Sequence, residues 1–150
     1  MMLINVCCCR VARYAPGSLV KHIPEHITGI TLPWIYFGMA CSTFCWHTED
    51  HFFASINYVH WGAPKVWYGL PGRAAPKFDS LLKEKYGDLA DSTRNLFVDI
   101  VTMVDPAELA DAQLPVCRAV QLPGQFVVTY PRSYHAGFNV GINCAEAVNF

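Results

Sequence analysis

Three side chains in this sequence have the chemistry to hold one metal ion. His47 and Glu49 are separated by a single residue, and His135 lies far downstream. Two imidazoles and one carboxylate are the donors that hold a redox-active iron(II) on one face and leave the opposite face open for a cosubstrate and dioxygen. A His-x-Glu pattern alone is a weak signal, so the elements that would position these donors must support it.

Strand geometry gives the short spacing a mechanical meaning. Residues i and i+2 of a strand point to the same face, so an extended segment would aim His47 and Glu49 in one direction. His135 can join them only through the tertiary fold. Two sheets folded over each other would bring such distant residues together.

Short aromatic and β-branched runs, bounded by Gly or Pro, dominate the chain and predict strands. These runs are 34–39, 55–61, 65–70, 116–121, 125–130, 134–139 and 143–150. Apolar residues at helical spacing predict one helix over 73–86 and a short helical turn over 106–112, whereas 98–104 fits either a strand or a buried helix. Seven or eight short strands with one or two inserted helices favour a mostly β fold, a jelly roll or cupin-like barrel.

Composition restricts the functional class. At 150 residues, with 53% apolar and 13% aromatic content, the chain suits one domain with a substantial core. Charged residues make up 15% and the net charge is −1, so we expect a protein partner and no direct binding to DNA. Polar residues and prolines interrupt every long apolar run, so no membrane span is expected. Seven cysteines without a Cys-x-x-Cys pair indicate a reducing compartment, cytosol or nucleus.

Two further pairs at i, i+2 spacing suggest a cosubstrate pocket. Ser55 and Asn57 form one pair, and Lys65 and Trp67 form the other. A buried Lys65 would need an anion beside it, because an unpaired ammonium in an apolar site is costly. A dicarboxylate such as 2-oxoglutarate could chelate iron at its keto-acid end while Lys65 and Asn57 hold its far carboxylate, between Trp67 and Phe44. The alternative is a snorkelling lysine whose head group reaches water.

Segments 29–72 and 123–150 resemble the catalytic core of Jumonji-C (JmjC) histone lysine demethylases. The runs that carry the resemblance are Phe44-Cys45-Trp46-His47-Thr48-Glu49-Asp50-His51, Ser55-Ile56-Asn57-Tyr58-Val59-His60-Trp61-Gly62, Tyr134-His135-Ala136-Gly137-Phe138-Asn139 and Asn143-Cys144-Ala145-Glu146-Ala147-Val148-Asn149-Phe150. The runs most similar to the branch that acts on the fourth residue of histone H3, which we favour, are Pro33-Trp34, Phe44-Cys45-Trp46, Asp50-His51 and His60-Trp61-Gly62. Thr48 and Ala136-Gly137 are closer to the branch that acts on its ninth and thirty-sixth residues.

The resemblance implies a double-stranded β-helix and a role for each matching residue. The implied iron ligands are His47, Glu49 and His135; the implied 2-oxoglutarate contacts are Lys65, Asn57, Ser55, Phe44 and Trp67; the implied contacts to methyl-lysine are Gly29, Trp34 and Tyr36. The implied activity is that of a nuclear Fe(II)- and 2-oxoglutarate-dependent dioxygenase. It would use dioxygen to demethylate a methylated histone H3 tail by N-methyl hydroxylation, releasing formaldehyde and succinate. The alternatives are a JmjC protein hydroxylase and a catalytically weak, chromatin-binding JmjC fragment.

Departures from the family pattern lie at the two ends. Residues 1–28 form an irregular lead-in, and 1–20 do not resemble the family segment whose tyrosine helps to bind 2-oxoglutarate. Residues 29–150 correspond to the JmjC catalytic core, which we expect to be truncated at both ends. A chain of this kind is expected to be marginally stable and prone to aggregate. Judged singly, His22, His26, His51, His60, Trp46 and Trp61 are expected to be core residues.

Overall fold

Two antiparallel sheets of four strands form the body of the protein in the computed structural model, which describes residues 13–92 and 103–150. The strand order is β1-β8-β3-β6 in the first sheet and β2-β7-β4-β5 in the second. The strands are β1 (Trp34–Gly38), β2 (Thr43–His47), β3 (Ser55–Gly62), β4 (Lys65–Gly69), β5 (Cys117–Gln121), β6 (Phe126–Thr129), β7 (His135–Asn139) and β8 (Asn143–Asn149). This mostly β architecture confirms the fold class expected from the sequence.

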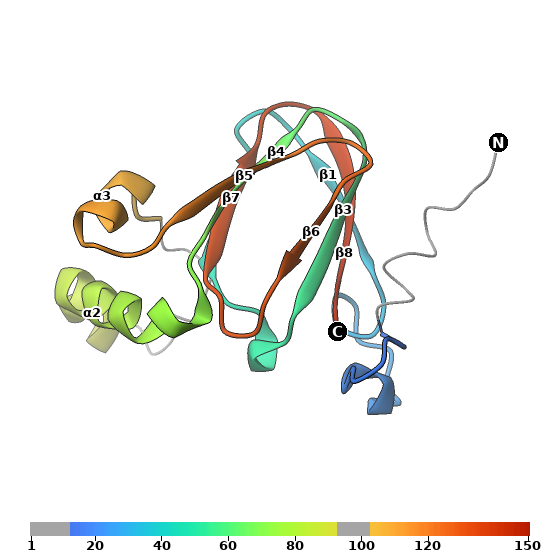
Figure 1. The fold of residues 1–150 in the computed structure, drawn as a ribbon, viewed down its shortest axis with the longest axis horizontal. Coiled ribbons are helices and arrows are strands. Elements are labelled where there is room, and N and C mark those ends of the chain that lie inside the picture. Colours follow the sequence, from blue (N-terminus) through green and yellow to red (C-terminus); the bar gives the residue numbers. More distant parts are fainter. Residues whose placement is uncertain (1–12, 93–102) are drawn as a thin grey trace.

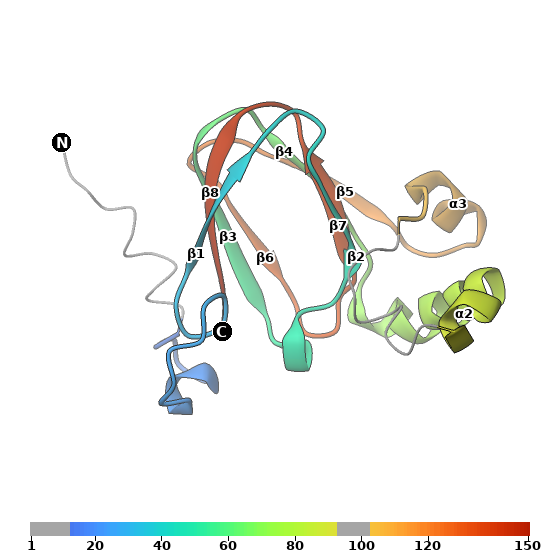
Figure 2. The ribbon, with the colours of Figure 1, turned by 180° about the vertical axis from the view of Figure 1, so that it is seen from behind.

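The chain passes from one sheet to the other at almost every connection, as in a jelly roll. Among the described strands, only β4 and β5, which are linked by the helical segment, lie next to each other in both sequence and sheet. The two sheets face each other and diverge downward in the view of Figure 1, and Figure 2 shows the same arrangement from behind. Each expected strand is present, and β2 is an additional strand that the sequence patterns did not predict.

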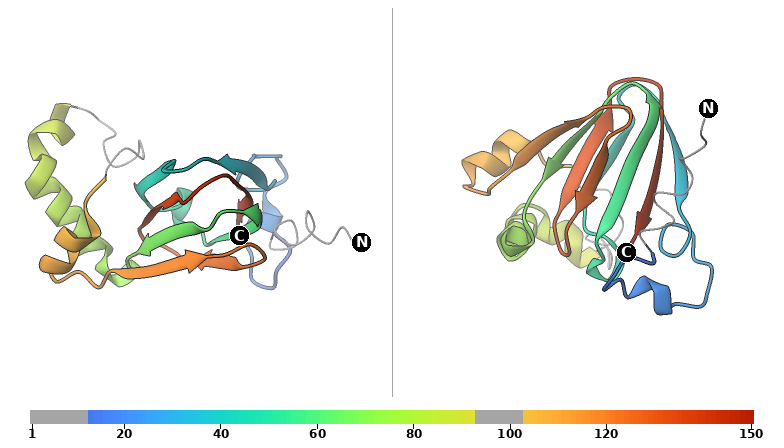
Figure 3. Two further views of the ribbon diagram at one scale, coloured as in Figure 1. Left: turned by 90° about the horizontal axis from the view of Figure 1, so that it is seen from above. Right: turned by 45° about the vertical axis from the view of Figure 1, so that its right-hand side comes forward.

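Two helices cover the outer face of the second sheet. α2 (Ala75–Ser92) follows a 3-10 turn at Gly72–Ala74, and α3 (Pro106–Asp111) begins after Asp105, whose carboxylate accepts a hydrogen bond from the Ala107 amide at 2.8 Å. Both were expected close to these positions. Residues 98–102 lie outside the described residues. The choice between a strand and a buried helix over 98–104 therefore stays a prediction. Figure 3 shows both helices on one side of the barrel.

The main hydrophobic core lies between these helices and the second sheet, outside the barrel. Phe78 and Leu109 are fully buried there, and Trp46 and Ala136 reach them from β2 and β7. The Trp46 indole donates a hydrogen bond to the Val104 carbonyl at 2.9 Å. Because apolar packing supports the second sheet from outside, its inner face is free to carry polar residues. The expectation that Trp46 belongs to the core is confirmed.

The outer face of the first sheet has no such cover from the described elements. Phe37 and Trp61 are 75% and 50% exposed there, with their rings 6.4 Å apart. The expectation that Trp61 is a core residue was therefore wrong, because the aromatic pattern of a strand does not reveal which sheet face will be covered. His22, His26 and His51 are also exposed, contrary to expectation.

His60 comes nearer to the expectation than His22, His26 and His51, because it is partly buried, with a side chain that is 12% exposed. It contacts the fully buried Glu146 at 2.9 Å on the same outer face. Burial raises the pKa of Glu146, while the contact with His60 acts to lower it. Across the described residues, no helix has the length and apolar content needed to span a membrane.

Candidate metal and cosubstrate site

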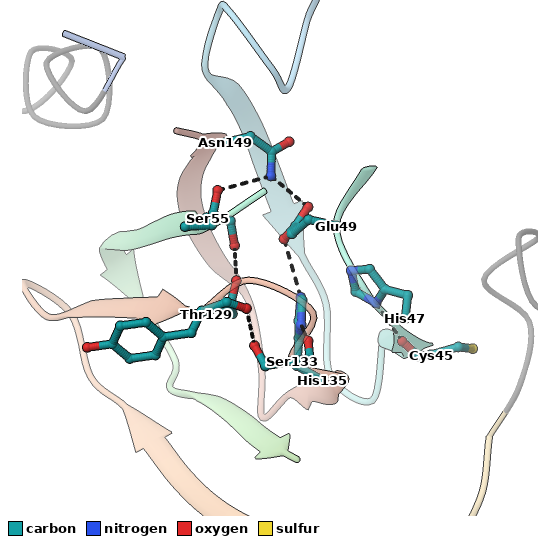
Figure 4. Close-up of polar contacts among 10 residues, drawn as sticks. Cys45, His47, Glu49, Ser55, Thr129, Ser133, His135 and Asn149 are labelled. Carbon is teal, nitrogen blue, oxygen red and sulfur yellow. Dashed lines mark hydrogen bonds and ion pairs between the residues drawn. The ribbon is translucent and has the colours of Figure 1, made fainter. Parts of the chain in front are cut away.

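Strand register brings the three candidate metal ligands together. His47 is the last residue of β2, His135 is the first residue of β7, and the two are paired directly across these antiparallel strands. Glu49 lies two residues beyond His47 in an extended conformation. One potential ligand atom from each residue lies within 4.8 Å of the others. Figure 4 shows His47 and Glu49 on one stretch of the chain and His135 on another, with Glu49 joined to His135 by a dashed line.

Hydrogen bonds to the main chain orient both imidazoles. Nδ1 of His47 lies 2.8 Å from the Cys45 carbonyl, and Nδ1 of His135 lies 3.1 Å from the Ser133 carbonyl. A carbonyl only accepts hydrogen bonds, so each Nδ1 is the donor, and in the neutral ring the Nε2 atom then presents a lone pair. This arrangement of a ligand nitrogen backed by a main-chain acceptor is typical of histidine in metal sites.

The carboxylate of Glu49 is held from two sides. Asn149 Nδ2 donates to one oxygen at 2.9 Å, and His135 Nε2 lies 3.4 Å from the other. Burial acts to raise the pKa of Glu49, but its contacts with His135, Asn149 and Ser55 outweigh burial and lower the pKa to about 2. Burial and the neighbouring His135 lower the pKa of His47. Near neutral pH the site therefore offers a charged carboxylate and a neutral imidazole at position 47, the forms that bind a metal.

All the residues singled out in the sequence line one pocket with a volume of about 300 Å³. They are Gly29, Trp34, Tyr36, Phe44, His47, Glu49, Ser55, Asn57, Lys65, Trp67 and His135. Sequence reasoning missed Asn149, which also lines the pocket. Asn149 lies at the end of β8 and is paired with Ser55 across the sheet, so its place in the pocket depends on strand register.

Lys65 lines the same pocket and pairs with Asn139, at the opposite end of β7 from His135. It is 6% exposed, so it does not snorkel to water. Its ammonium donates to Asn139 Oδ1 at 2.8 Å and lies 5.4 Å from the centre of the Phe44 ring. Among the residues that the structure describes, no carboxylate forms an ion pair with it. Burial lowers the pKa of Lys65 to about 8. The site thus contains a buried cation that lacks a counter-charge.

A neutral amide network holds Lys65 in place. Asn139 Oδ1 also accepts from Asn143 Nδ2 at 2.8 Å, and Asn139 Nδ2 donates to Ser42 Oγ at 2.8 Å. A Cβ atom at Gly38 would lie 2.3 Å from Asn143 Oδ1, so only glycine fits beside the network. Because Asn143 lies on the first sheet and Asn139 on the second, these bonds join the two sheets.

Aromatic rings wall the space between Lys65 and the histidines. Phe44 and Trp67 meet edge to face with ring centres 4.8 Å apart, and Trp67 Nε1 donates to Gln121 Oε1 at 2.8 Å. Gly137 makes room for this packing, because a Cβ there would lie 2.0 Å from the Val66 carbonyl oxygen and 2.6 Å from Phe44. Within the described residues, the buried Asn57 Oδ1 has no hydrogen-bond partner. It is a polar atom available to a ligand in the pocket.

Two half-exposed rings stand at the open side of the pocket. Trp34 and Tyr36 are 53% and 41% exposed, and their rings meet edge to face at 5.7 Å. Burial and the charge of Glu49 raise the pKa of Tyr36. Gly29 adopts φ +86°, a conformation natural to glycine, and its carbonyl accepts the Asn149 amide at 2.9 Å. The mouth is therefore tied to the same β8 residue that orients Glu49.

A jelly roll that carries two histidines and one carboxylate at the mouth of its barrel defines a class of metal-dependent oxygenase folds. The family model described as "JmjC domain, hydroxylase" matches residues 34–150. The chain belongs to the JmjC family.

Curated relatives agree with this membership. Over 134 residues the chain is 51% identical to Lysine-specific demethylase JMJ17 of Arabidopsis thaliana, and the aligned region covers 89% of this chain and 11% of that protein. Over 133 residues it is 50% identical to Lysine-specific demethylase 5B of Gallus gallus, covering 89% of this chain and 9% of the relative. The chain thus spans about a tenth of the length of these relatives.

Proposed function

We propose that this chain carries the catalytic core of an Fe(II)- and 2-oxoglutarate-dependent dioxygenase that demethylates methyl-lysine on histone H3. One observation carries the proposal: a single pocket holds three metal-ligating side chains at one end and a buried, unpaired ammonium at the other. A metal ion satisfies the first group, and the far carboxylate of 2-oxoglutarate satisfies the second.

The donor set fits iron(II). His47, Glu49 and His135 supply two nitrogens and one oxygen within 4.8 Å of one another. The main-chain contacts at each Nδ1 leave the Nε2 atoms of the neutral rings as the nitrogens that would bind the metal. When bound, iron(II) with 2-oxoglutarate and dioxygen supplies the oxidation of an N-methyl group to a hydroxymethyl group, which collapses to formaldehyde, with succinate and carbon dioxide as coproducts. The protein contributes binding, orientation and the exclusion of water.

The pocket walls fit the cosubstrate. Lys65 binds the far carboxylate, because its ammonium has no ion-pair partner among the described residues. Asn57 lines the same pocket and would bind that carboxylate through its Nδ2 donor, since a carboxylate only accepts hydrogen bonds. Phe44 and Trp67 enclose the methylene chain, and Ser55 lines the pocket beside Asn57. The apolar walls strengthen the charge pairing at Lys65, since a low local dielectric increases electrostatic attraction.

The mouth fits a methylated ammonium. Trp34 and Tyr36 present aromatic surface on the pocket side of β1, and a cation that keeps its charge is attracted to such rings. Gly29 approaches without a side chain and leaves room for the substrate. The names of the curated relatives support lysine demethylation, and the runs around Trp34 and His60 favour the fourth residue of histone H3. A histone substrate would require the chain to act in the nucleus.

The test is a histone H3 peptide trimethylated at its fourth residue, incubated with the chain, iron(II), ascorbate and 2-oxoglutarate, and followed by mass spectrometry. We expect loss of methyl mass together with formaldehyde and succinate, and no turnover in His47→Ala. The matched control is His51→Ala, which removes an exposed histidine near the site and should remain active.

Other outcomes identify the alternatives. A stable hydroxylated product without formaldehyde would identify a protein hydroxylase. Binding of metal and peptide without turnover of 2-oxoglutarate would identify a binding module. Peptides methylated at the ninth or thirty-sixth residue distinguish the two branches of the family.

A further inference from the structure

The position of His135 depends on the turn that precedes it. Its Nδ1 proton is held by the carbonyl of Ser133, so that carbonyl sets both the tautomer and the ring orientation. Ser133 is fixed in a tight turn, where its amide donates to the Tyr130 carbonyl at 3.1 Å. Arg132 within the turn adopts φ +60°, a conformation that non-glycine residues rarely take. A turn of this kind needs outside support to keep its geometry.

Tyr134 supplies a connection from this turn to the helical layer. Its hydroxyl donates to Asp79 Oδ1 on α2 at 2.7 Å, and its ring meets Phe78 edge to face at 4.7 Å. Its carbonyl accepts the Leu70 amide at 2.8 Å. The residue just before the metal ligand is therefore anchored by its main chain to the end of β4 and by its side chain to α2.

We propose that Asp79 and Tyr134 are positioning residues for His135, and that their hydrogen bond fixes the Ser133 carbonyl that orients the imidazole. Neighbouring residues in an extended chain point to opposite faces. Tyr134 therefore reaches into the helix-covered core while His135 reaches into the pocket. A shift of Tyr134 turns the intervening backbone and moves both the Ser133 carbonyl and the ring of His135. The inference rests on the proposed metal site and adds α2 to the elements that shape it.

Three substitutions isolate the hydrogen bond. Asp79→Ala removes the acceptor, and Tyr134→Phe removes the donor while keeping the ring against Phe78. Asp79→Asn keeps an acceptor oxygen for Tyr134 and should therefore keep the geometry of His135. The matched control is Ser80→Ala, because Ser80 is the next residue of α2 and bonds only to the Pro76 carbonyl of its own helix.

The main measurement is cobalt(II) affinity and the visible spectrum of the bound cobalt in the full 150-residue chain. Loss of a direct hydrogen bond to a metal-ligating histidine weakens metal binding about 10- to 100-fold, so we expect about a 3- to 10-fold loss for this more remote tether. Asp79→Ala and Tyr134→Phe should share this loss and an altered spectrum. Asp79→Asn and Ser80→Ala should match the unmodified chain.

A second measurement needs no metal. Nitrogen-15 NMR of the His135 ring should show the Nδ1-protonated tautomer in the unmodified chain and a mixture of tautomers in Asp79→Ala. Unchanged cobalt affinity and an unchanged tautomer in both Asp79→Ala and Tyr134→Phe, with only lower thermal stability, would overturn the proposal. If the unmodified chain binds no cobalt, the proposed function fails, and the tautomer measurement still decides the role of Asp79.

Discussion

Replacing Lys65 by methionine should stabilise the protein and disable cosubstrate binding at the same time. The pKa of Lys65 is lowered by burial from 10.5 to about 8, which corresponds to about 3 kcal/mol of unfavourable free energy for the charged form in the folded state. Methionine has a similar length and carries no charge. Removing the buried charge stabilises the folded state by that amount, and losing the hydrogen bond to Asn139 offsets about 1 kcal/mol of the stabilisation.

The net expectation is a chain more stable by about 1 to 2 kcal/mol at pH 7, which corresponds to a rise in Tm of about 3 to 8 °C for a protein of this size. The pH dependence gives an independent check of sign. Between about pH 8 and pH 10.5 the folded state binds fewer protons at Lys65 than the unfolded state does. The stability of the unmodified chain should therefore rise with pH across this window, and Lys65→Met should lack that rise.

Affinity for 2-oxoglutarate should change in the opposite direction. A charge-assisted hydrogen bond contributes about 1.5 to 3 kcal/mol, so Lys65→Met should bind 2-oxoglutarate about 10- to 100-fold more weakly. Calorimetric titration of the manganese-loaded chain measures this, and differential scanning calorimetry measures Tm. Lys83→Met, which removes an exposed lysine, is the control for both. A destabilised Lys65→Met chain, or one that binds 2-oxoglutarate normally, would refute the reasoning.

Three other perturbations test the same site. Asn139→Asp places a carboxylate beside Lys65, so 2-oxoglutarate should bind at least about 10-fold more weakly in titration calorimetry while manganese affinity is unchanged. Unchanged affinity for 2-oxoglutarate would contradict the inference that Lys65 lacks a counter-charge within the protein. Gly137→Ala should cost about 2 kcal/mol or more in urea unfolding, because its Cβ would lie 2.0 Å from the Val66 carbonyl oxygen; wild-type stability would show that the strands can separate. Glu49 has a folded pKa of about 2, below its usual 4.5, so its contribution to stability is present above pH 4.5 and lost as pH falls toward 2. Glu49→Gln should flatten the stability profile across that acid window, and an unchanged profile would argue against the hydrogen bonds to Glu49.

Much of the site follows from local patterns in the chain. The alternation of a strand places Ser55 with Asn57, and Lys65 with Trp67, on one face whatever the rest of the fold does. The spacing of His47 and Glu49 likewise aims both toward one point, although Glu49 lies just beyond the end of β2. These residues could be identified because their relationship depends on a period of two within a single segment.

Other features depend on contacts between distant segments. Asn139 meets Lys65 because β7 pairs with β4, and Asn149 of β8 meets Glu49, which lies between β2 and β3. In both contacts the partners are far apart in sequence. The exposure of Trp61 and the burial of Trp46 differ because helices cover one sheet and not the other.

Residue types and their alternation thus predicted the candidate metal ligands, the candidate cosubstrate lysine and the mostly β class of this protein. The arrangement of the sheets established which donors meet, which charge is left without a partner and which aromatic rings face the pocket. The physical reason is that side-chain direction along a strand is a local property of the backbone. Burial and pairing depend on register and on the layer that packs against each face.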